Sequence, residues 1–284
     1  MATVSEENKN KRCDVCGADM STRSADFFIC ASCRYMFSNL APGRGAEVEG
    51  VASVRLINYK IICDIIKNEY SSNANILDVG CANGLFLSTA RDEGFYAVGL
   101  EPDLEMAAAA RDLGFDVGDG FFPESEWLAG KSFDTIVFND SFEHIPNPNE
   151  IIAGIKRYLN ENGIVIVNIP SSSGLIFTLS FLMSKIGITS PLDRLWQKGF
   201  ASPHLHYFNP ENLQLLFENH GFQRIYHTFL KSYTLNGLWK RMRCNTPFLK
   251  SIIAWCCLVA FYPFYSLLKS KSDISLSLFK KRAS

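Results

Sequence analysis

The sequence predicts an α/β protein with a doubly wound, mostly parallel sheet and a four-cysteine zinc ribbon in front of it. Two observations carry this prediction. A short apolar strand at residues 75–79 runs into a glycine-punctuated turn and then a helix, and further apolar runs alternate with helical patterns up to about residue 230. Two Cys-x-x-Cys pairs precede them. We therefore expect a zinc ribbon and linker at 1–45 and an α/β domain at 46–284.

The two cysteine pairs have the spacing of a zinc ribbon. Cys13-x-x-Cys16 and Cys30-x-x-Cys33 are separated by 13 residues, and Gly17 permits a tight turn after the first pair. Each pair can present two thiolates to one tetrahedral Zn²⁺, which leaves no position open for water, so the metal is expected to be structural. Two disulfides are the alternative, but further unpaired thiols disfavour an oxidised scaffold. These thiols are Cys63, Cys81, Cys244, Cys256 and Cys257.

A linker and a helix are expected next. Residues 38–50 contain Pro42, Gly43, Gly45 and Gly50, which favour a connecting segment. Residues 54–70 have helical spacing with one broad apolar face. We expect this helix to cover the sheet and the mouth of the cofactor site.

The turn after the first strand predicts a nucleotide-type cofactor. Residues 76–79 have the composition of a buried parallel strand, and Gly80 and Gly84 let the backbone approach a ligand that a Cβ atom would exclude. A dinucleotide fold has the pattern G-x-G-x-x-G at this place. This chain has Asp78-x-Gly80-x-Ala82-x-Gly84 instead, so NAD is a poor fit.

The turn resembles motif I of the class I S-adenosylmethionine (SAM) methyltransferases, with Ala82 where a middle glycine commonly stands. The strand at 95–100, the strand at 133–139 and the loop with the letters EHIPNP at 143–148 fit the same family. A helix at 149–159, a strand at 163–169 and the segment 204–226 resemble its closing part. The resemblance covers roughly residues 70–230 plus a last strand, and it implies a seven-stranded Rossmann-like fold and an acceptor of the ubiquinone or sugar methyltransferase type.

The resemblance also implies which residues hold SAM. Glu101 closes the second strand, where a carboxylate accepts the ribose hydroxyls, and Asp119 corresponds to the acidic residue beside the adenine amino group. Asn139 and Asp140 are expected at the methionine end, whereas Asp134 is expected to be structural. The full predicted cofactor set is Asp78, Gly80, Cys81, Ala82, Gly84, Glu101, Pro102, Asp119, Gly120, Asn139 and Asp140.

The catalytic demand on the protein is modest because the sulfonium carries its own leaving group. Positioning and deprotonation of the acceptor remain, and the latter needs a base within hydrogen-bond reach. His144, just beyond the fourth strand, is the best-placed base, with Glu143 as its partner. His204 and His206 come next. Each also has a structural interpretation, as an anchor of a loop, a helix cap or a packing residue.

Two apolar insertions, at about 171–200 and 231–271, begin where predicted parallel strands end. Ligands of doubly wound sheets bind outside the carboxyl ends of the strands. Both insertions, with apolar parts at 175–188 and 248–268, should therefore border the mouth of the active site.

The second insertion is nearly long enough to cross a bilayer. However, residues 273–280 alternate like a strand and resemble the family's final antiparallel strand, which must return to the sheet. Pro263 is also expected to break a straight helix. We therefore expect peripheral contact with a membrane surface, with Trp255, Tyr262 and Tyr265 at the interface. A lid or dimer contact and a true membrane span are the alternatives.

Charge and composition restrict the partners. The net charge is −1, so no global basic field indicates nucleic acid. Residues 231–284 hold ten Lys or Arg against one acidic residue, Asp273, which suits anionic headgroups. The polar start of the chain shows no secretory signal. We therefore expect a cytoplasmic protein, with contact to the cytoplasmic face of the membrane.

The acceptor is expected to be a small molecule, either a sugar or a lipid-linked glycan intermediate, methylated on oxygen in the first instance, with nitrogen and carbon as alternatives. This expectation follows because residues 27–37 resemble the second knuckle of bacterial methyltransferases with an N-terminal ribbon, many of which act in cell-surface glycan pathways. A quinone-type lipid remains an alternative, as does an inactive SAM-binding scaffold. A further alternative is RNA gripped by ribbon and linker cations. These cations are Lys9, Lys11, Arg12, Arg23, Arg34 and Arg44.

Overall fold

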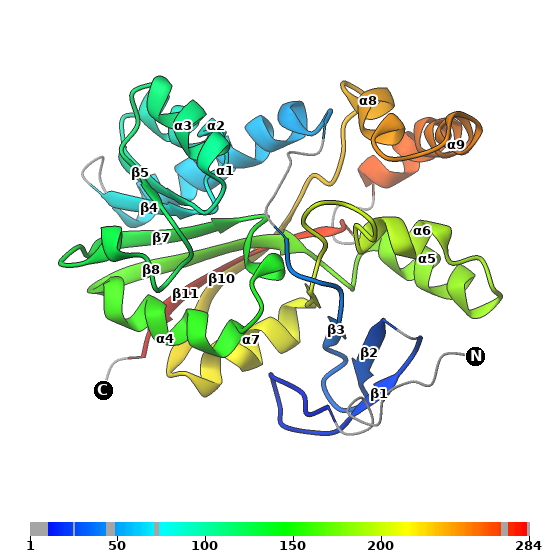
Figure 1. Cartoon of the computed structure of the whole chain (residues 1–284), viewed down its shortest axis with the longest axis horizontal. Helices are drawn as coiled ribbons and strands as arrows, with labels where there is room; N and C mark the ends of the chain where they lie inside the picture. Colours follow the sequence, from blue (N-terminus) through cyan, green and yellow to red (C-terminus); the bar gives the residue numbers. More distant parts are fainter. Residues whose placement is uncertain (1–10, 25, 44–48, 71–73, 268–271, 283–284) are drawn as a thin grey trace.

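A computed structural model describes residues 11–24, 26–43, 49–70, 74–267 and 272–282 (Figure 1). The ribbon and the first half of the sheet domain comprise β1 (Met20–Thr22), β2 (Phe27–Cys30), β3 (Met36–Ser38), α1 (Ala52–Glu69), β4 (Asn75–Val79), α2 (Leu85–Asp92), β5 (Tyr96–Glu101), α3 (Leu104–Asp112), β6 (Val117–Asp119), η2 (Glu126–Leu128) and β7 (Phe133–Asn139). The rest comprises η3 (Phe142–His144), α4 (Pro148–Tyr158), β8 (Leu159–Pro170), α5 (Leu175–Lys185), α6 (Ser190–Leu195), β9 (His206–Tyr207), α7 (Pro210–Asn219), β10 (Phe222–Leu230), α8 (Leu238–Arg243), α9 (Phe248–Leu267) and β11 (Ile274–Lys281). Lys9, Arg44, Gly45, Leu268 and the predicted polar start lie outside the described residues.

The main sheet has seven strands among the described residues, in the order β10-β11-β8-β7-β4-β5-β6. β11 is antiparallel to both neighbours, and Ile274 pairs with Pro170. The strands from β8 to β6 are parallel. The predicted fold class is confirmed, as is the return of the last strand to the sheet. β4 has β5 on one side and β7 on the other, so the ligand crevice should open at its carboxyl end.

Helices cover both faces of the sheet (Figure 1). α1, α2 and α3 lie on one face, and α4 and α7 lie on the other. The predicted helix at 54–70 is observed as α1, whose buried residues Tyr59, Ile62 and Ile66 pack in one apolar cluster with Phe86 and Ile76. The predicted apolar face is therefore narrower than the sequence pattern indicates, because Leu56, Ile57 and Ile61 are 41%, 37% and 36% exposed.

The ribbon is joined to the main domain by a shared sheet. β1, β2 and β3 form an antiparallel sheet, and β3 also pairs with β9, where Phe37 lies opposite His206. Tyr35 belongs to the same buried apolar cluster as Phe208 and Phe217. The four-stranded ribbon sheet thus crosses the predicted domain boundary near residue 45.

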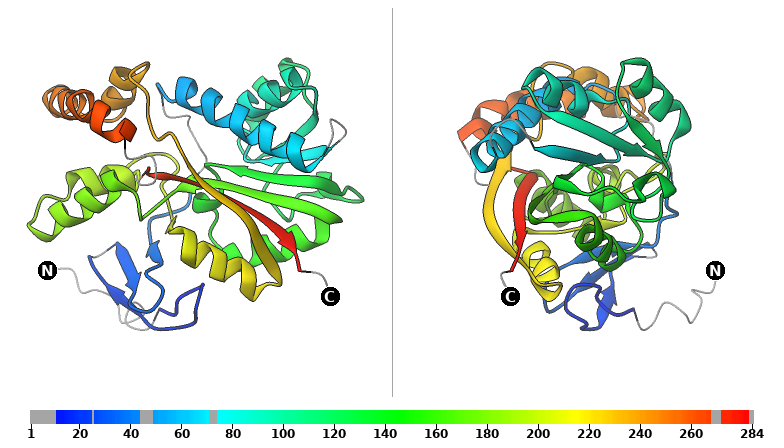
Figure 2. Two further views of the ribbon diagram at one scale, coloured as in Figure 1. Left: turned by 180° about the vertical axis from the view of Figure 1, so that it is seen from behind. Right: turned by 90° about the vertical axis from the view of Figure 1, so that its left-hand side faces the viewer.

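Both insertions project from the same end of the main sheet (Figures 1 and 2). The first forms α5 and α6, and the second forms α8 and α9. Phe248–Tyr265 is long and apolar enough to cross a membrane by length and composition alone, and 11% of this stretch is buried.

Two expectations for α9 were wrong. The helix continues through Pro263, whose missing N–H removes only the hydrogen bond to the carbonyl of Val259 one turn earlier. Tyr265 is buried rather than interfacial. Its hydroxyl lies 2.6 Å from Ser232 Oγ and 2.7 Å from Ser272 Oγ, so it anchors α9 to the domain.

Candidate active site

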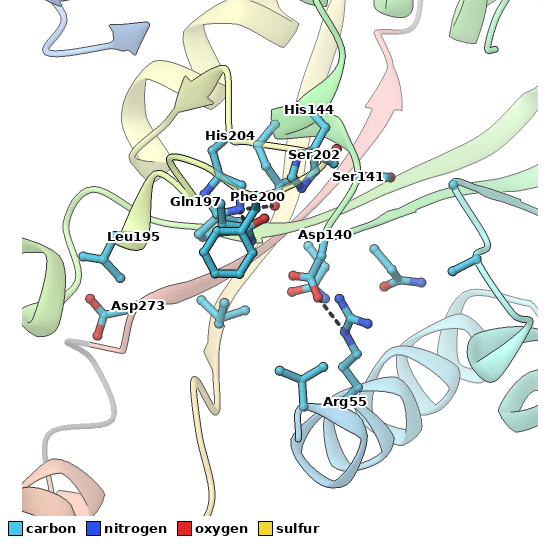
Figure 3. Close-up of a pocket in the computed structure, with 18 of the residues that line it drawn as sticks. Arg55, Asp140, Ser141, His144, Leu195, Gln197, Phe200, Ser202, His204 and Asp273 are labelled. Atoms are coloured by element: carbon cyan, nitrogen blue, oxygen red, sulfur yellow. Dashed lines mark hydrogen bonds and ion pairs between the residues drawn. The ribbon is translucent and has the colours of Figure 1, made fainter. Parts of the chain in front are cut away.

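A cavity of about 1240 Å³ opens beside the carboxyl ends of β4, β5 and β7 (Figure 3). Its walls extend to Phe177 of α5 and to Ile253 and Leu258 of α9. Small-molecule sites usually measure roughly 300–1,000 Å³, so this cavity has room for a cofactor and an acceptor together. Both insertions border it, as their place in the chain predicts.

The glycine turn forms one end of the cavity. Gly80 has φ +77°, and a Cβ atom there would lie 2.8 Å from Ser141 Cβ, so a side chain at this position would force Ser141 to move. Gly80 N–H donates to Leu100 O at 2.8 Å, which ties the turn to β5. Gly84, with φ +84°, is the N-cap of α2. The turn therefore brings bare backbone and a helix N-terminus to the cavity, the usual way to hold a nucleotide.

Glu101 is buried beside the turn and lines the cavity. Its two oxygens accept hydrogen bonds from Ala82 N at 2.8 Å and Asp103 N at 3.0 Å. Burial raises the pKa of Glu101, and the two N–H groups act in the opposite direction. Each carboxylate oxygen has a second lone pair, so this fixed group can still accept a pair of hydroxyl donors.

Three buried polar side chains lie close to the carboxyl ends of β4, β7 and β8: Asp78, Asn139 and Asn168. Asn139 Nδ2 donates to Asp78 Oδ1 at 3.3 Å, and burial raises the pKa of Asp78 to about 7. Within the described residues, Asn139 Oδ1 and Asn168 Oδ1 are buried without a hydrogen-bond partner. Buried acceptors without a partner indicate a missing donor, and a ligand ammonium group would supply one. Sequence reasoning missed Asn168, although a single polar residue in the apolar run 163–169 was a signal.

Asp140 directly follows β7 and adopts a positive φ of +50°. Its Oδ2 accepts a hydrogen bond from Arg55 Nε at 3.1 Å (Figure 3). Arg55 comes from the first helix and was not predicted. The sequence indicated only that this helix covers the cofactor mouth.

Glu143, His144 and His204 line the cavity beyond the glycine turn. Figure 3 shows the His144 and His204 rings beside each other, with their centroids 4.8 Å apart. His144 Nδ1 lies 2.9 Å from Pro203 O and 3.2 Å from Ser202 Oγ. Since a carbonyl oxygen only accepts, Nδ1 carries the proton, and the lone pair of the neutral ring is on Nε2. Burial lowers the pKa of His144, so the ring is a neutral base at pH 7.

His204 Nε2 lies 3.9 Å from Glu143 Oε1 and 2.9 Å from Gln197 Nε2. Burial lowers the pKa of His204 well below its ordinary value and raises that of Glu143 well above its own. Both Glu143 oxygens and His204 Nδ1 are buried without a partner within the described part of the chain. Donor atoms of Glu143, His144 and His204 lie within 4.8 Å of one another, a spacing that also admits a metal ion. These unpartnered atoms can therefore form hydrogen bonds with a polar ligand in the cavity.

Three predicted site residues do not line the cavity. The first is Gly84, where a Cβ atom would lie 3.2 Å from Ala110 Cβ and 3.2 Å from the Phe115 ring and so faces packed side chains. His206 is buried, its Nδ1 contacts the Tyr35 hydroxyl and its Nε2 lies 2.7 Å from Ile145 O. It does not line the cavity, so the structure gives a catalytic role for His206 no support: its ring joins Tyr35 of the ribbon to Ile145 of the 143–148 loop. Asp119 stands at the end of β6, but its carboxylate pairs with Arg111 at 2.8 Å and does not line the cavity. The next residue, Gly120, lines the cavity instead. The structure gives the adenine contact of Asp119 no support.

The four ribbon cysteines converge as the zinc prediction requires. Cys13 Sγ and Cys33 Sγ lie 3.5 Å apart, as do Cys16 Sγ and Cys30 Sγ, and all four sulfurs lie within 4.8 Å of one another. Zn–S bonds of about 2.3 Å in a tetrahedron put sulfurs roughly 3.8 Å apart, which this set nearly meets. A disulfide needs about 2.05 Å, so the cysteines are free thiols.

This fold, with a glycine turn at β4 and an acidic residue closing β5, defines the class I methyltransferases. The methyltransferase-domain family model matches residues 57–227, and the chain belongs to that family. We therefore expect S-adenosylmethionine to bind at the glycine-turn end of the cavity.

Named relatives agree with the class. A ubiquinone biosynthesis O-methyltransferase from Rickettsia canadensis is 24% identical over 135 residues, which cover 45% of this chain and 57% of that protein. The C-methyltransferase NovU from Streptomyces niveus is 26% identical over 150 residues, or 51% and 32% of the two chains. A SAM-dependent methyltransferase from Thermotoga maritima superimposes with a TM-score of 0.52 at 14% identity, over 82% and 91% of the two chains. The match to the O-methyltransferase thus spans little more than half of that protein's length.

Replacing Glu101 by Ala is expected to weaken SAM binding at least fivefold, because a charged hydrogen-bond acceptor is worth about 1 kcal/mol or more. Glu101→Gln should lose less, since one acceptor oxygen remains. Isothermal titration calorimetry with SAM measures both variants. Glu105→Ala, at an exposed acidic residue of α3, is the matched control. Equal affinities of the Glu101→Ala variant and the control would remove Glu101 from the site.

Proposed function

We propose that the protein transfers the methyl group of SAM to a hydroxyl oxygen of a lipid-linked acceptor, a sugar or glycan intermediate, at the cytoplasmic face of a membrane. One observation carries this proposal. A single cavity includes the glycine turn, the Glu143–His144–His204 cluster and the apolar side chains of α5 and α9. An acceptor with a polar head and an apolar chain fits a cavity that has both a polar cluster and an apolar wall.

The chemistry assigns each group a task. Bound SAM supplies an electrophilic methyl group on a sulfonium. Glu101 fixes the ribose, and Asn139 and Asn168 offer acceptors to the amino end. The His144 Nε2 lone pair takes the acceptor hydroxyl proton as the new O–CH₃ bond forms and the S–CH₃ bond breaks. His204 and Glu143 hold the hydroxyl in line by hydrogen bonds.

A quinone-type lipid is the second candidate, because ubiquinone O-methyltransferases recur among the relatives. Like the lipid-linked sugar or glycan, a quinone-type lipid has a polar head and an apolar chain.

One labelling experiment separates these candidates. Purified protein and methyl-labelled SAM are incubated with the organic and aqueous phases of a cell extract. We expect label in an organic-phase product, and mild acid should release that label into water if the methyl group is on a sugar joined through phosphate. Acid-stable label in the organic phase would indicate the quinone-type lipid. Ribonuclease-sensitive label would indicate RNA, and no labelled product in any phase would support an inactive scaffold.

We also propose that Cys13, Cys16, Cys30 and Cys33 bind one structural Zn²⁺. The support is the convergence of four thiol groups in a set that offers only soft ligands. Four protein ligands leave no open coordination position, so the ion would stabilise the ribbon and take no part in methyl transfer.

Membrane contact through α9 can be tested by adding charge to its exposed face. Leu249 and Phe264 are 69% and 64% exposed, and inserting each into lipid gains about 1.5–3 kcal/mol. The double variant Leu249→Glu, Phe264→Glu should therefore bind vesicles of 3:1 phosphatidylcholine and phosphatidylglycerol at least tenfold more weakly. Co-sedimentation measures the partition. Leu104→Glu with Leu113→Glu, at residues 60% and 55% exposed on and after α3, is the control. Equal sedimentation of both double variants would exclude the interfacial placement.

A further inference from the structure

Two arginines of the insertions line the cavity away from the glycine turn. Arg194 lies on α6 and Arg241 lies on α8. Arg194 donates hydrogen bonds to Cys244 O at 2.9 Å, to Thr246 Oγ1 at 2.5 Å and to Arg241 O. Arg241 donates to Ser232 O at 2.7 Å. All these acceptors are uncharged.

No carboxylate forms an ion pair with either guanidinium within the described ranges of the chain. Asp140 and Asp273 act on Arg241 only at longer range and have closer partners. Asp140 accepts from Arg55, and Asp273 accepts from the first-turn N–H groups of α5, at 2.7 Å for Phe177 N. Lys231 and Lys250 add two more cationic side chains to the cavity wall. The charge on this part of the wall is therefore positive and only partly balanced.

Holding two like charges in a partly buried site costs free energy unless an anion joins them. Burial lowers the pKa of Arg241, and the neighbouring charge of Arg194 lowers it further. Guanidinium groups stay charged in proteins, so the electrostatic cost remains in the free protein. Arginine is also the residue whose planar donor fork matches phosphate oxygens.

The apolar side chains beside the two arginines indicate that the bound anion carries an apolar chain. Ile176 on one side and Ala254 and Leu258 on the other line the same cavity as the arginines. These three apolar side chains also belong to one cluster, which lies between the two insertions. A chain attached to the phosphate would contact this apolar wall, and the same cavity holds the His144 cluster for the group on the other side of the phosphate.

We propose that Arg194 and Arg241 bind the phosphate or diphosphate that joins the lipid chain of the acceptor to the group that is methylated. This inference rests on the proposed lipid-linked acceptor and names its linking group. It excludes an uncharged amphiphile as the preferred ligand. A quinone-type lipid without an anionic group would leave both guanidinium charges unmatched.

Calorimetry on the full-length protein saturated with S-adenosylhomocysteine tests this inference. Farnesyl diphosphate should bind at least tenfold more tightly than farnesol, and added salt should reduce the difference. Arg241→Gln should abolish the preference, and Arg241→Lys should retain part of it. Arg243→Gln is the matched control, because Arg243 lies on the same helix but does not line the cavity. S-adenosylhomocysteine affinity and melting temperature check that each variant is folded.

The outcomes separate this inference from the proposed function. Equal binding of farnesol and farnesyl diphosphate, or equal losses in Arg241→Gln and Arg243→Gln, would overturn the phosphate site but leave a lipid acceptor standing. Failure of both prenyl ligands to bind would overturn the lipid-linked acceptor itself. Tighter binding of UDP-glucose than of farnesyl diphosphate would assign the phosphate to a soluble nucleotide sugar and overturn the lipid link.

Discussion

Replacing His144 by Gln is expected to slow methyl transfer by about 10²–10⁴-fold, the usual contribution of a positioned general base. The Pro203 carbonyl holds the proton on Nδ1, so only Nε2 can accept the acceptor proton. Glutamine retains the polarity and approximate size of the side chain but has no lone pair of comparable basicity. SAM affinity should be unchanged, because His144 belongs to the acceptor part of the cavity. Methyl transfer to the labelled product and SAM calorimetry measure the two quantities.

The pH profile of the wild-type protein provides a second measurement. Burial lowers the pKa of His144 below that of free imidazole, and the base must be neutral to act. The rate should therefore rise with pH through a midpoint below 6.5 and be constant at pH 7 and above. His227→Gln is the control, because His227 lies on β10, bonds Ser275 and does not line the cavity. Retention of more than a tenth of wild-type activity by His144→Gln would contradict the assignment.

Replacing Cys30 by Ser is expected to remove the zinc and to lower the melting temperature by at least about 8 °C. Loss of a structural metal costs about 4 kcal/mol or more, and each kcal/mol corresponds to roughly 2–4 °C in a chain of this size. Cys30 is fully buried in the ribbon cluster that packs against α7. Metal analysis by mass spectrometry should fall from about one zinc per chain to none. Cys256→Ser, at an exposed thiol of α9, is the control.

The zinc effect should reach the catalytic loop. Ser38 N donates to Leu205 O at 2.8 Å, and Leu205 N donates to Glu143 O at 2.9 Å, so the ribbon strand β3, the 204–207 segment and Glu143 are linked in series. Amide hydrogen exchange at 204–207 should therefore accelerate in Cys30→Ser and stay unchanged in Cys256→Ser. A metal-free wild-type protein with normal melting temperature and normal exchange would defeat the zinc assignment.

Several parts of the molecule follow from local sequence. The apolar strand before Gly80, the helical spacing after residue 50 and the two cysteine pairs each depend on residues close together in the chain. Such patterns set backbone conformation and burial directly. The order of strands and helices, the glycine turn and the clustering of four thiols were predictable for this reason.

The role of His206 illustrates where local reasoning ends. Its place in the motif His204-Leu205-His206 made it resemble a second catalytic histidine, yet its ring contacts Tyr35, which is 171 residues away in the chain. Adjacent strand residues point to opposite sides and residues two apart to the same side, but the path of the loop gives His204 and His206 different surroundings. No periodicity in the sequence encodes that pairing.

The sequence by itself determined the class of this protein: the parallel sheet, the SAM turn with Glu101, and the two cysteine pairs. Only the tertiary structure decided how these parts combine. It joins the ribbon to Glu143 and its loop through β3 and β9, leaves Asn168 Oδ1 in the cavity without a hydrogen-bond partner among the described residues, and brings Arg194 and Arg241 to the cavity wall. The physical reason is that strand and turn patterns arise from neighbouring residues, whereas charge balance and cavity shape arise from contacts between segments far apart in the chain.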